Sequence, residues 1–518
     1  MRGRPTAFCA AFCAVYTLAA PAAQAQGRGG PNWTTYNSDA QRTSWMRTDP
    51  RISRESVQKP GAFQLIWKAK LDNQARQLNS LTQPVLLNTI ISYKGFKSLL
   101  FVGGSSDNAY SIDYDLNRIF WSRRFTPAPT AAGTSLCPGG LTAITRATPL
   151  GNASAGRGAP PPPPPPASPA RAGGAPPALT NNTNLPAALY AIASDGLAHV
   201  LNPQTGQDLF PPVKFLAPNA KVVGSVLVDN VLYAATADRC GNVPNGVWAV
   251  DFGSDVRTAT SWLTNGGSIV GTAAPALGTD GIVYAAVGSG DLSGSGYSDA
   301  VIALQAKTLT LKDSFTTASP FTTGPVVFQY KDRQVVLVAN KDGRLYLLDG
   351  ASLGGTDHNT PLFRSSVFAG AQSQPALATW EEADGTRWVL VSSSGAINAE
   401  TRFPQTNGSV TNGSVLAFKV VDRGGLPALQ PAWSSRDINN PVSPIVVNGV
   451  VFALAAGSAR GPSAILYVLD AATGKEFWNS GSAITSFVDS GALAAGDGQV
   501  YVPTHDNTLY AFGIPLEH

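Results

Sequence analysis

A four-residue element that recurs along the chain limits the possible folds more than any other feature. It is rich in aliphatic and aromatic residues, often ends in Asp, and occurs at residues 110–113, 199–202, 248–251, 302–305, 346–349, 416–419, 467–470 and 510–513. Five of the seven intervals between these copies are about 43 to 54 residues, which is the period of a four-stranded propeller blade. In the clearest copy, residues 443–478, four short apolar segments are separated by turns such as Asn448-Gly449. The sequence therefore predicts an all-β fold, an eight-bladed β-propeller of four-stranded antiparallel blades.

The last copy has room for only three strands before the chain stops. Residues 63–70 carry Trp67, in the position that tryptophan occupies at the ends of other repeats (Trp121, Trp433 and Trp478). We expect this N-terminal segment to complete the last blade and close the ring, which leaves only short, protected strand edges. We expect the tryptophans themselves to pack between blades rather than to bind a ligand.

Proline and aspartate recur at fixed places in the repeats. We expect proline to open the first strand, whose inner edge is free, at Pro84, Pro149, Pro275, Pro325, Pro375 and Pro444. Aspartate or asparagine precedes glycine or asparagine between strands, for example at Asp229-Asn230 and Asp497-Gly498. These pairs suit two-residue hairpin turns, so we interpret the aspartates as turn residues rather than as a site.

The first 25 residues have the features of an export signal. Arg2 and Arg4 precede an apolar stretch at 8–20 and an Ala23-Gln24-Ala25 cleavage site. The alternative, a membrane anchor, is disfavoured because the stretch is shorter than the ~20 residues that span a bilayer. We expect a periplasmic or secreted protein with an N-terminal arm at 26–60 and a propeller at 61–518. A proline-rich insertion at 151–186, with seven consecutive prolines at 160–166, cannot bury a core and is expected to be disordered.

Charge and cysteine content narrow the choice of partners. The formal net charge is +4, and loss of Arg2 and Arg4 with the signal would leave +2, so no nucleic-acid partner is expected. No segment beyond the export signal is suited to crossing a membrane. Of the four cysteines, only Cys137 and Cys240 lie beyond the signal. In an oxidising compartment we expect them to form a disulfide, with two free buried thiols as the alternative.

Long loops on one face of the ring are the expected working surface. We define the top face as the one that carries the links between blades and the connections from second to third strands. Four such connections are long: 238–245, 288–299, 392–414 and 457–463. They hold our candidate binding residues, Asp238, Arg239, Asp291 and Asp299. Asp291 and Asp299 could also offer oxygens to a hard cation, although solvated loop carboxylates are the preferred interpretation. Cys137 and Cys240 are expected on the same face.

Motifs for independent chemistry are absent from the sequence. The four histidines are scattered, and no His-Glu-x-x-His, Gly-x-Ser-x-Gly or phosphate-binding loop occurs. His199 lies on a predicted strand and is interpreted as a structural histidine. No catalytic residue is assigned.

Two segments resemble a known family. Residues 468–478 (VLDAATGKEFW) and 32–43 (NWTTYNSDAQRT) are similar to the repeat and the opening segment of pyrroloquinoline quinone (PQQ) proteins of the quinoprotein alcohol dehydrogenase-like superfamily. Enzymes of this family seat the quinone on a ring formed by two adjacent cysteines, beside a calcium or lanthanide ion, and some carry a c-type haem. This chain has no Cys-Cys pair and no Cys-x-x-Cys-His. The resemblance therefore implies the fold without that cysteine platform, and no haem c is expected.

Three functional hypotheses follow. The first is a monomeric, non-catalytic binding or scaffold protein that presents its top face to a protein, glycan or small-molecule ligand. The alternative is a PQQ-dependent dehydrogenase with a divergent cofactor site and calcium, which predicts a cluster of carboxylates at the channel mouth. The second alternative is a propeller similar to the outer-membrane protein assembly factors, although no lipid-attachment motif occurs at the N-terminus.

Overall fold

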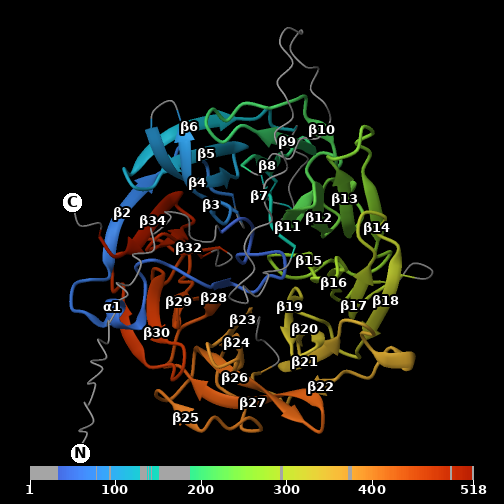
Figure 1. Ribbon diagram of the computed structural model, residues 1–518, viewed down its shortest axis with the longest axis vertical. Helices are drawn as coiled ribbons and strands as arrows, with labels where there is room; N and C mark the ends of the chain where they lie inside the picture. The colour runs from blue at the N-terminus through green and yellow to red at the C-terminus, as the bar shows by residue number, and fades with distance from the viewer. Residues whose placement is uncertain are drawn as a thin grey trace, which may run out of the picture.

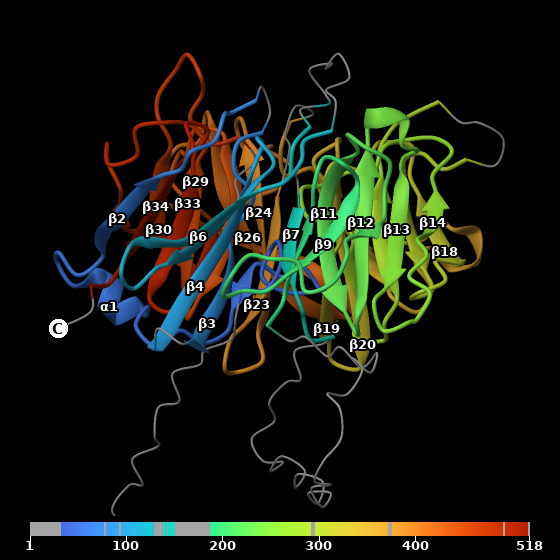
Figure 2. The same cartoon turned by 90° about the horizontal axis from the view of Figure 1, so that it is seen from above.

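The computed structural model describes residues 33–515 apart from 77–78, 93–94, 129–136, 138, 142, 151–186, 292–295, 371–375 and 490–492. Within these residues, eight β-sheets stand radially around a central channel (Figure 1). Six sheets have four strands and two have five. Seen from the side, the strands run between the two faces of the ring (Figure 2). The predicted eight-bladed propeller is confirmed.

In blades 1 to 4 the strands follow one another from the channel to the rim. Blades 1 and 2 contain β3 (Val85–Ser92), β4 (Gly95–Gly104), β5 (Asn108–Asp113), β6 (Arg118–Arg124), β7 (Ala143–Arg146), β8 (Leu189–Ile192), β9 (Leu197–Leu201) and β10 (Val213–Lys214). Blades 3 and 4 contain β11 (Lys221–Val228), β12 (Val231–Ala237), β13 (Gly246–Asp251), β14 (Thr260–Leu263), β15 (Ala276–Leu277), β16 (Val283–Val287), β17 (Ala300–Leu304) and β18 (Leu311–Thr316).

Blades 5 to 8 keep this order, with one extra strand in each of blades 6 and 7 and an N-terminal strand as the fourth strand of blade 8. Blades 5 and 6 contain β19 (Val326–Tyr330), β20 (Arg333–Asn340), β21 (Arg344–Asp349), β22 (Phe363–Arg364), β23 (Leu377–Glu381), β24 (Arg387–Ser394), β25 (Gln405–Thr406), β26 (Gly413–Arg423) and β27 (Leu426–Ser434). Blades 7 and 8 contain β1 (Trp45–Met46), β28 (Pro441–Val447), β29 (Val450–Ala455), β30 (Ile465–Asp470), β31 (Glu476–Asn479), β32 (Ala494–Gly496), β33 (Gln499–Pro503), β34 (Thr508–Gly513) and β2 (Gln64–Lys70). The short helices are α1 (Arg54–Gln58), η1 (Cys240–Asn242) and η2 (Gly355–Asp357).

The repeated sequence element forms the third strand of every blade, as its apolar character requires. These strands are largely buried, and the hydrophobic core is divided into clusters between neighbouring sheets. The predicted hairpin turns adopt the backbone conformation that their residues favour. Both residues have positive φ at Asp229-Asn230 (49° and 63°) and at Asp497-Gly498 (52° and 80°). The turn interpretation of these aspartates therefore agrees with the structure.

The proline expectation holds for only some of the repeats. Pro84, Pro275 and Pro325 directly precede β3, β15 and β19. Pro149 does not open a strand, because β7 ends at Arg146 before it. Pro444 lies inside β28 at an irregularity of register between Val442 and Ile445, where a missing donor costs no ladder bond. Pro375 lies outside the described residues.

The ring is closed by β2, which pairs antiparallel with β34 and is the outer strand of blade 8. Tryptophans at the outer strands bind the next blade. The indole N–H of Trp67 donates to the carbonyl of Tyr114 in blade 1, at 3.1 Å. Trp433 of blade 6 makes the equivalent bond to Ala471 of blade 7, at 2.9 Å. These contacts confirm the packing role expected for the tryptophans.

The N-terminal arm passes through the centre of the ring, where Figure 1 shows the blue start of the chain. Its carbonyl oxygens accept hydrogen bonds from N–H groups on the channel side of the inner strands. The pairs are Trp33 with Leu86 (2.7 Å), Thr34 with Arg146 (2.8 Å), Ala40 with Leu277 (2.8 Å), Gln41 with Val327 (2.9 Å), Thr43 with Thr379 (3.0 Å) and Ser44 with Val446 (2.9 Å). The arm then leaves by the bottom face, where Asp49 accepts from the first-hairpin turn of blade 8 at Gly498. It thus satisfies polar groups that would otherwise be buried without partners.

Two expected segments fall outside the described residues, namely the export signal at 1–25 and the insertion at 151–186. The insertion lies in the sequence between β7 and β8, the first and second strands of blade 2, as expected. No helix in the described ranges has the length and hydropathy needed to cross a membrane.

Candidate functional site: a cavity at the top of the channel

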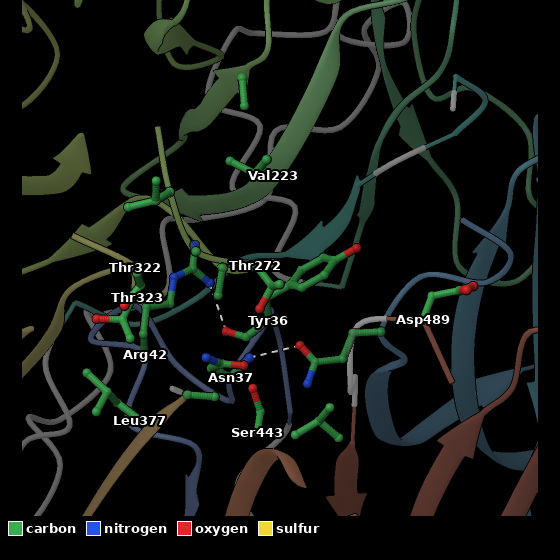
Figure 3. A pocket seen from close by; sticks show the side chains of 18 of the residues that line it. Tyr36, Asn37, Arg42, Val223, Thr272, Thr322, Thr323, Leu377, Ser443 and Asp489 are labelled. Carbon is green, nitrogen blue, oxygen red and sulfur yellow. Dashed lines mark hydrogen bonds between the residues drawn. The ribbon is translucent and has the colours of Figure 1, made fainter. Parts of the chain in front are cut away.

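The top end of the central channel holds a cavity of about 690 Å³ (Figure 3). Its lower side is formed by Tyr36, Asn37 and Arg42 of the arm. Its walls are the links between blades and the top ends of inner strands, in segments 79–83, 221–223, 237–238, 268–273, 321–326, 376–377, 440–443, 456–457 and 488–489. Because the arm crosses the channel and leaves by the bottom face, the cavity opens toward the top face.

Arg42 fixes the floor of the cavity. Its side chain is only 1% exposed, and its guanidinium donates to the carbonyls of Pro275, Tyr36 and Ser225 at 2.8, 2.8 and 3.2 Å. It also donates to the hydroxyl of Thr35, at 2.9 Å. Burial lowers the pKa of Arg42 to about 9, so it is still a cation at neutral pH. Hydrogen bonds to oxygens of four residues hold the floor in one position.

The remaining ionisable groups that line the cavity each have a partner at hydrogen-bond distance. On blade 3, the ammonium of Lys221 lies 2.6 Å from a carboxylate oxygen of Asp238. On the link between blades 7 and 8, Asp489 lies 2.7 Å from Nδ1 of His505. Burial raises the pKa of the Asp489 carboxyl, while His505 acts in the opposite direction.

Three neutral side chains on the lining have no hydrogen-bond partner among the described residues, namely Asn37, Thr272 and Ser443. Figure 3 shows them around the same space, Asn37 from the arm, Thr272 from the link between blades 3 and 4, and Ser443 from blade 7. Asn37 has a left-handed backbone conformation, with φ of 54°, which asparagine tolerates better than most residues. Its backbone N–H is fixed by the side chain of Gln83, at 2.9 Å. The amide is therefore positioned by the arm and available to a ligand.

Of the four predicted site residues, only Asp238 lines the cavity. Arg239 is exposed, and its backbone N–H donates to Asn245 within the same loop, at 3.0 Å. Asp291 is exposed, while Asp299 accepts a hydrogen bond from Ser289 at 3.1 Å. Arg239, Asp291 and Asp299 are therefore not part of the cavity lining.

No group of three or more His, Cys, Asp or Glu side chains suited to a metal ion occurs in the part of the chain that is described. His199 is buried, with Nδ1 at 3.0 Å from Asp208, in agreement with a structural role.

The expected disulfide is present. Cys137, in the link between blades 1 and 2, is bonded to Cys240 at the start of η1 in blade 3, with 5.4 Å between the Cα atoms. It ties together top-face segments near the cavity.

Sequence reasoning missed most of the site. Tyr36, Asn37 and Arg42 were part of a recognisable opening segment, but nothing local showed that this segment crosses the channel. Asp489 and His505 are separated by 16 residues and carry no motif. The available signal was the position of the lining residues just before each first strand, which places them at the top of the channel in any propeller.

The donor set of the cavity does not suit a quinone with a hard metal ion beside it. Its two carboxylates among the described residues, Asp238 and Asp489, lie on blade 3 and between blades 7 and 8, where they contact Lys221 and His505. Calcium and lanthanide ions need several oxygen ligands converging on one point. The carboxylate cluster that a quinone-dependent dehydrogenase would show is not formed by these residues.

Comparison with known proteins identifies the fold. No family model matches the sequence, and a search of curated proteins by sequence also finds no match. Among solved structures, the quinohemoprotein alcohol dehydrogenase from Comamonas testosteroni aligns over 94% of this chain and 82% of its own, with 13% identity and a TM-score of 0.54. A europium-containing methanol dehydrogenase aligns over 94% and 98%, with 12% identity and a TM-score of 0.55. Sqt1 from Saccharomyces cerevisiae aligns over 86% and 100%, with 10% identity and a TM-score of 0.50. The chain thus has the propeller fold of the quinoprotein dehydrogenases.

Proposed function

We propose that this chain is an exported, non-catalytic binding protein that holds a small ligand in the cavity at the top of its channel. The observation that carries the proposal is the closed floor, where a buried and fully positioned arm presents the free amide of Asn37 to a space of about 690 Å³. Cavities of ~300–1,000 Å³ with a few positioned polar groups are typical of small-molecule sites. A floor with rigid hydrogen bonds loses little entropy when a ligand binds.

Binding is favoured over catalysis by the state of the reactive groups. The carboxylates and the histidine at the cavity are occupied with each other or with Lys221, and the free groups are a carboxamide and two hydroxyls. Neither hydroxyl has a base hydrogen-bonded to it among the described residues, which a nucleophile would need.

The test uses purified mature protein, a small-molecule extract of the producing cells, and native mass spectrometry. We expect a mass adduct that survives buffer exchange. Thr272→Trp, which fills the cavity, should abolish the adduct, whereas Thr258→Trp at an exposed threonine outside the cavity should keep it. An adduct that persists in Thr272→Trp, or no adduct at all, would contradict the proposal.

The dehydrogenase alternative is tested on the same protein. After incubation with PQQ and Ca²⁺ and removal of excess reagents, we expect no stoichiometric quinone absorbance, because the donor set does not match. Stoichiometric quinone absorbance that is lost in Thr272→Trp would contradict the binding proposal and favour the dehydrogenase.

A further inference from the structure

We infer that the ligand of the top cavity is a neutral, hydroxyl-rich molecule of mono- or disaccharide size. The inference rests on the proposed function and adds the chemical class of the ligand. It is carried by the internal pairing of the charges, by the free neutral groups and by the apolar surfaces between them.

Charge pairing disfavours a charged ligand. Lys221 and Asp238 neutralise each other at 2.6 Å, and His505 lies 2.7 Å from Asp489. Arg42 directs its donors to oxygens of the protein itself. An ionic ligand would have to break one of these contacts or lose water without gaining a counter-ion, and either loss is costly in a partly buried site.

The free groups match hydroxyl chemistry. The Asn37 amide has two N–H donors and a carbonyl acceptor, while the hydroxyls of Thr272 and Ser443 can each donate and accept. A ligand hydroxyl also donates and accepts, so each of these groups can either donate a hydrogen bond to it or accept one from it. Because they come from the arm, from a link and from blade 7 on different sides of the space, a ligand with several hydroxyls would contact all three (Figure 3).

The surfaces between the polar groups are apolar. Val223 and Leu377 line the walls, and the ring of Tyr36 lies at the floor (Figure 3). A pyranose has C–H faces as well as hydroxyl edges, so it can pack on these side chains while it bonds to the polar ones. A volume of about 690 Å³ accommodates one or two such rings.

The experiment is ligand-observed NMR by saturation transfer with a defined panel. The neutral probes are glucose, galactose, mannose, sorbitol, maltose and cellobiose, and the charged probes of matched size are gluconate and cellobionate. We expect at least one neutral probe to bind at millimolar concentration, and to bind more tightly than its carboxylate counterpart. Carboxylates that bind more tightly, or a panel without a neutral binder, would overturn the inference.

Variants locate the contact. Asn37→Asp keeps the size and the left-handed backbone preference but removes the N–H donors, and Thr272→Val removes one hydroxyl. Each variant should lower the affinity for the neutral probe by about 3- to 10-fold, the effect of one lost hydrogen bond. Thr258→Val should leave affinity unchanged, and equal affinities in all three variants would overturn the inference. An extract adduct that depends on Thr272, together with no saccharide binding, would reject the ligand class and leave the proposed function intact.

Discussion

The contact between Trp433 and blade 7 should contribute measurably to the stability of the ring. Its side chain is 0% exposed, and its indole donates to Ala471 at 2.9 Å. The ring also covers Gly474, where an added Cβ would come within 2.3 Å of the indole. We expect Trp433→Ala to lower the free energy of unfolding by about 3–5 kcal/mol, the usual cost for a fully buried tryptophan. Of this, about 1 kcal/mol comes from the lost hydrogen bond.

Trp121 provides an internal control with the same geometry and less burial. It donates to Pro203 at 2.8 Å and covers Gly206, but its side chain is partly exposed. Trp121→Ala should therefore cost less, about 1–3 kcal/mol. The measurement is guanidinium unfolding followed by circular dichroism, with comparison of midpoints at an unchanged slope. If Trp121→Ala costs as much as Trp433→Ala, burial does not set the strength of these contacts and the reasoning is refuted.

Three further predictions concern the arm and the top face. Arg42→Lys should lower the free energy of unfolding by about 2–4 kcal/mol, because lysine cannot reach all the oxygens to which Arg42 donates. The control Arg436→Lys, at a surface ion pair, should cost less than about 1 kcal/mol, and similar costs for both variants would contradict the prediction. Reduction of the Cys137–Cys240 bond, which spans 103 residues, should cost about 2–5 kcal/mol, and identical unfolding midpoints with and without reductant would disprove it. Burial acts to raise the pKa of Asp437, but hydrogen bonds from three consecutive backbone N–H groups outweigh it and lower that pKa. These hydrogen bonds to the Asp437 carboxylate are therefore intact at neutral pH and are lost as the pH falls through the lowered value. Hydrogen-exchange protection of these three amides should fall as Asp437 is protonated. An equal fall with pH in Asp437→Asn would show that Asp437 is not the cause.

Local sequence determined most of the fold. The repeated element marked all eight third strands because those strands are buried on both faces and keep an apolar pattern in every blade. Trp67 marked the closing strand because its indole donates a hydrogen bond to the next blade, as that of Trp433 does. The assignment of Pro149 to a strand start was wrong because proline also suits the segment after a strand, and only pairing with β8 shows that β7 ends at Arg146.

The site was much less accessible from sequence. Loop length pointed to the face on which the cavity opens, and Asp238 lines that cavity, but Asp291 and Asp299 do not. The floor depends on contacts between Arg42 and residues more than 180 positions away, such as Ser225 and Pro275. No local pattern encodes such contacts, because they exist only once the arm lies in the completed channel.

The route of the arm ties blade number to the length of a short segment. Successive residues from Trp33 to Ser44 are matched in chain order to blades 1, 2, 4, 5, 6 and 7. A duplication or deletion of one blade would shift every later blade by one step along this template, and each would face the wrong carbonyl. A propeller of this kind can therefore change its blade count only if its arm gains or loses residues at the same time.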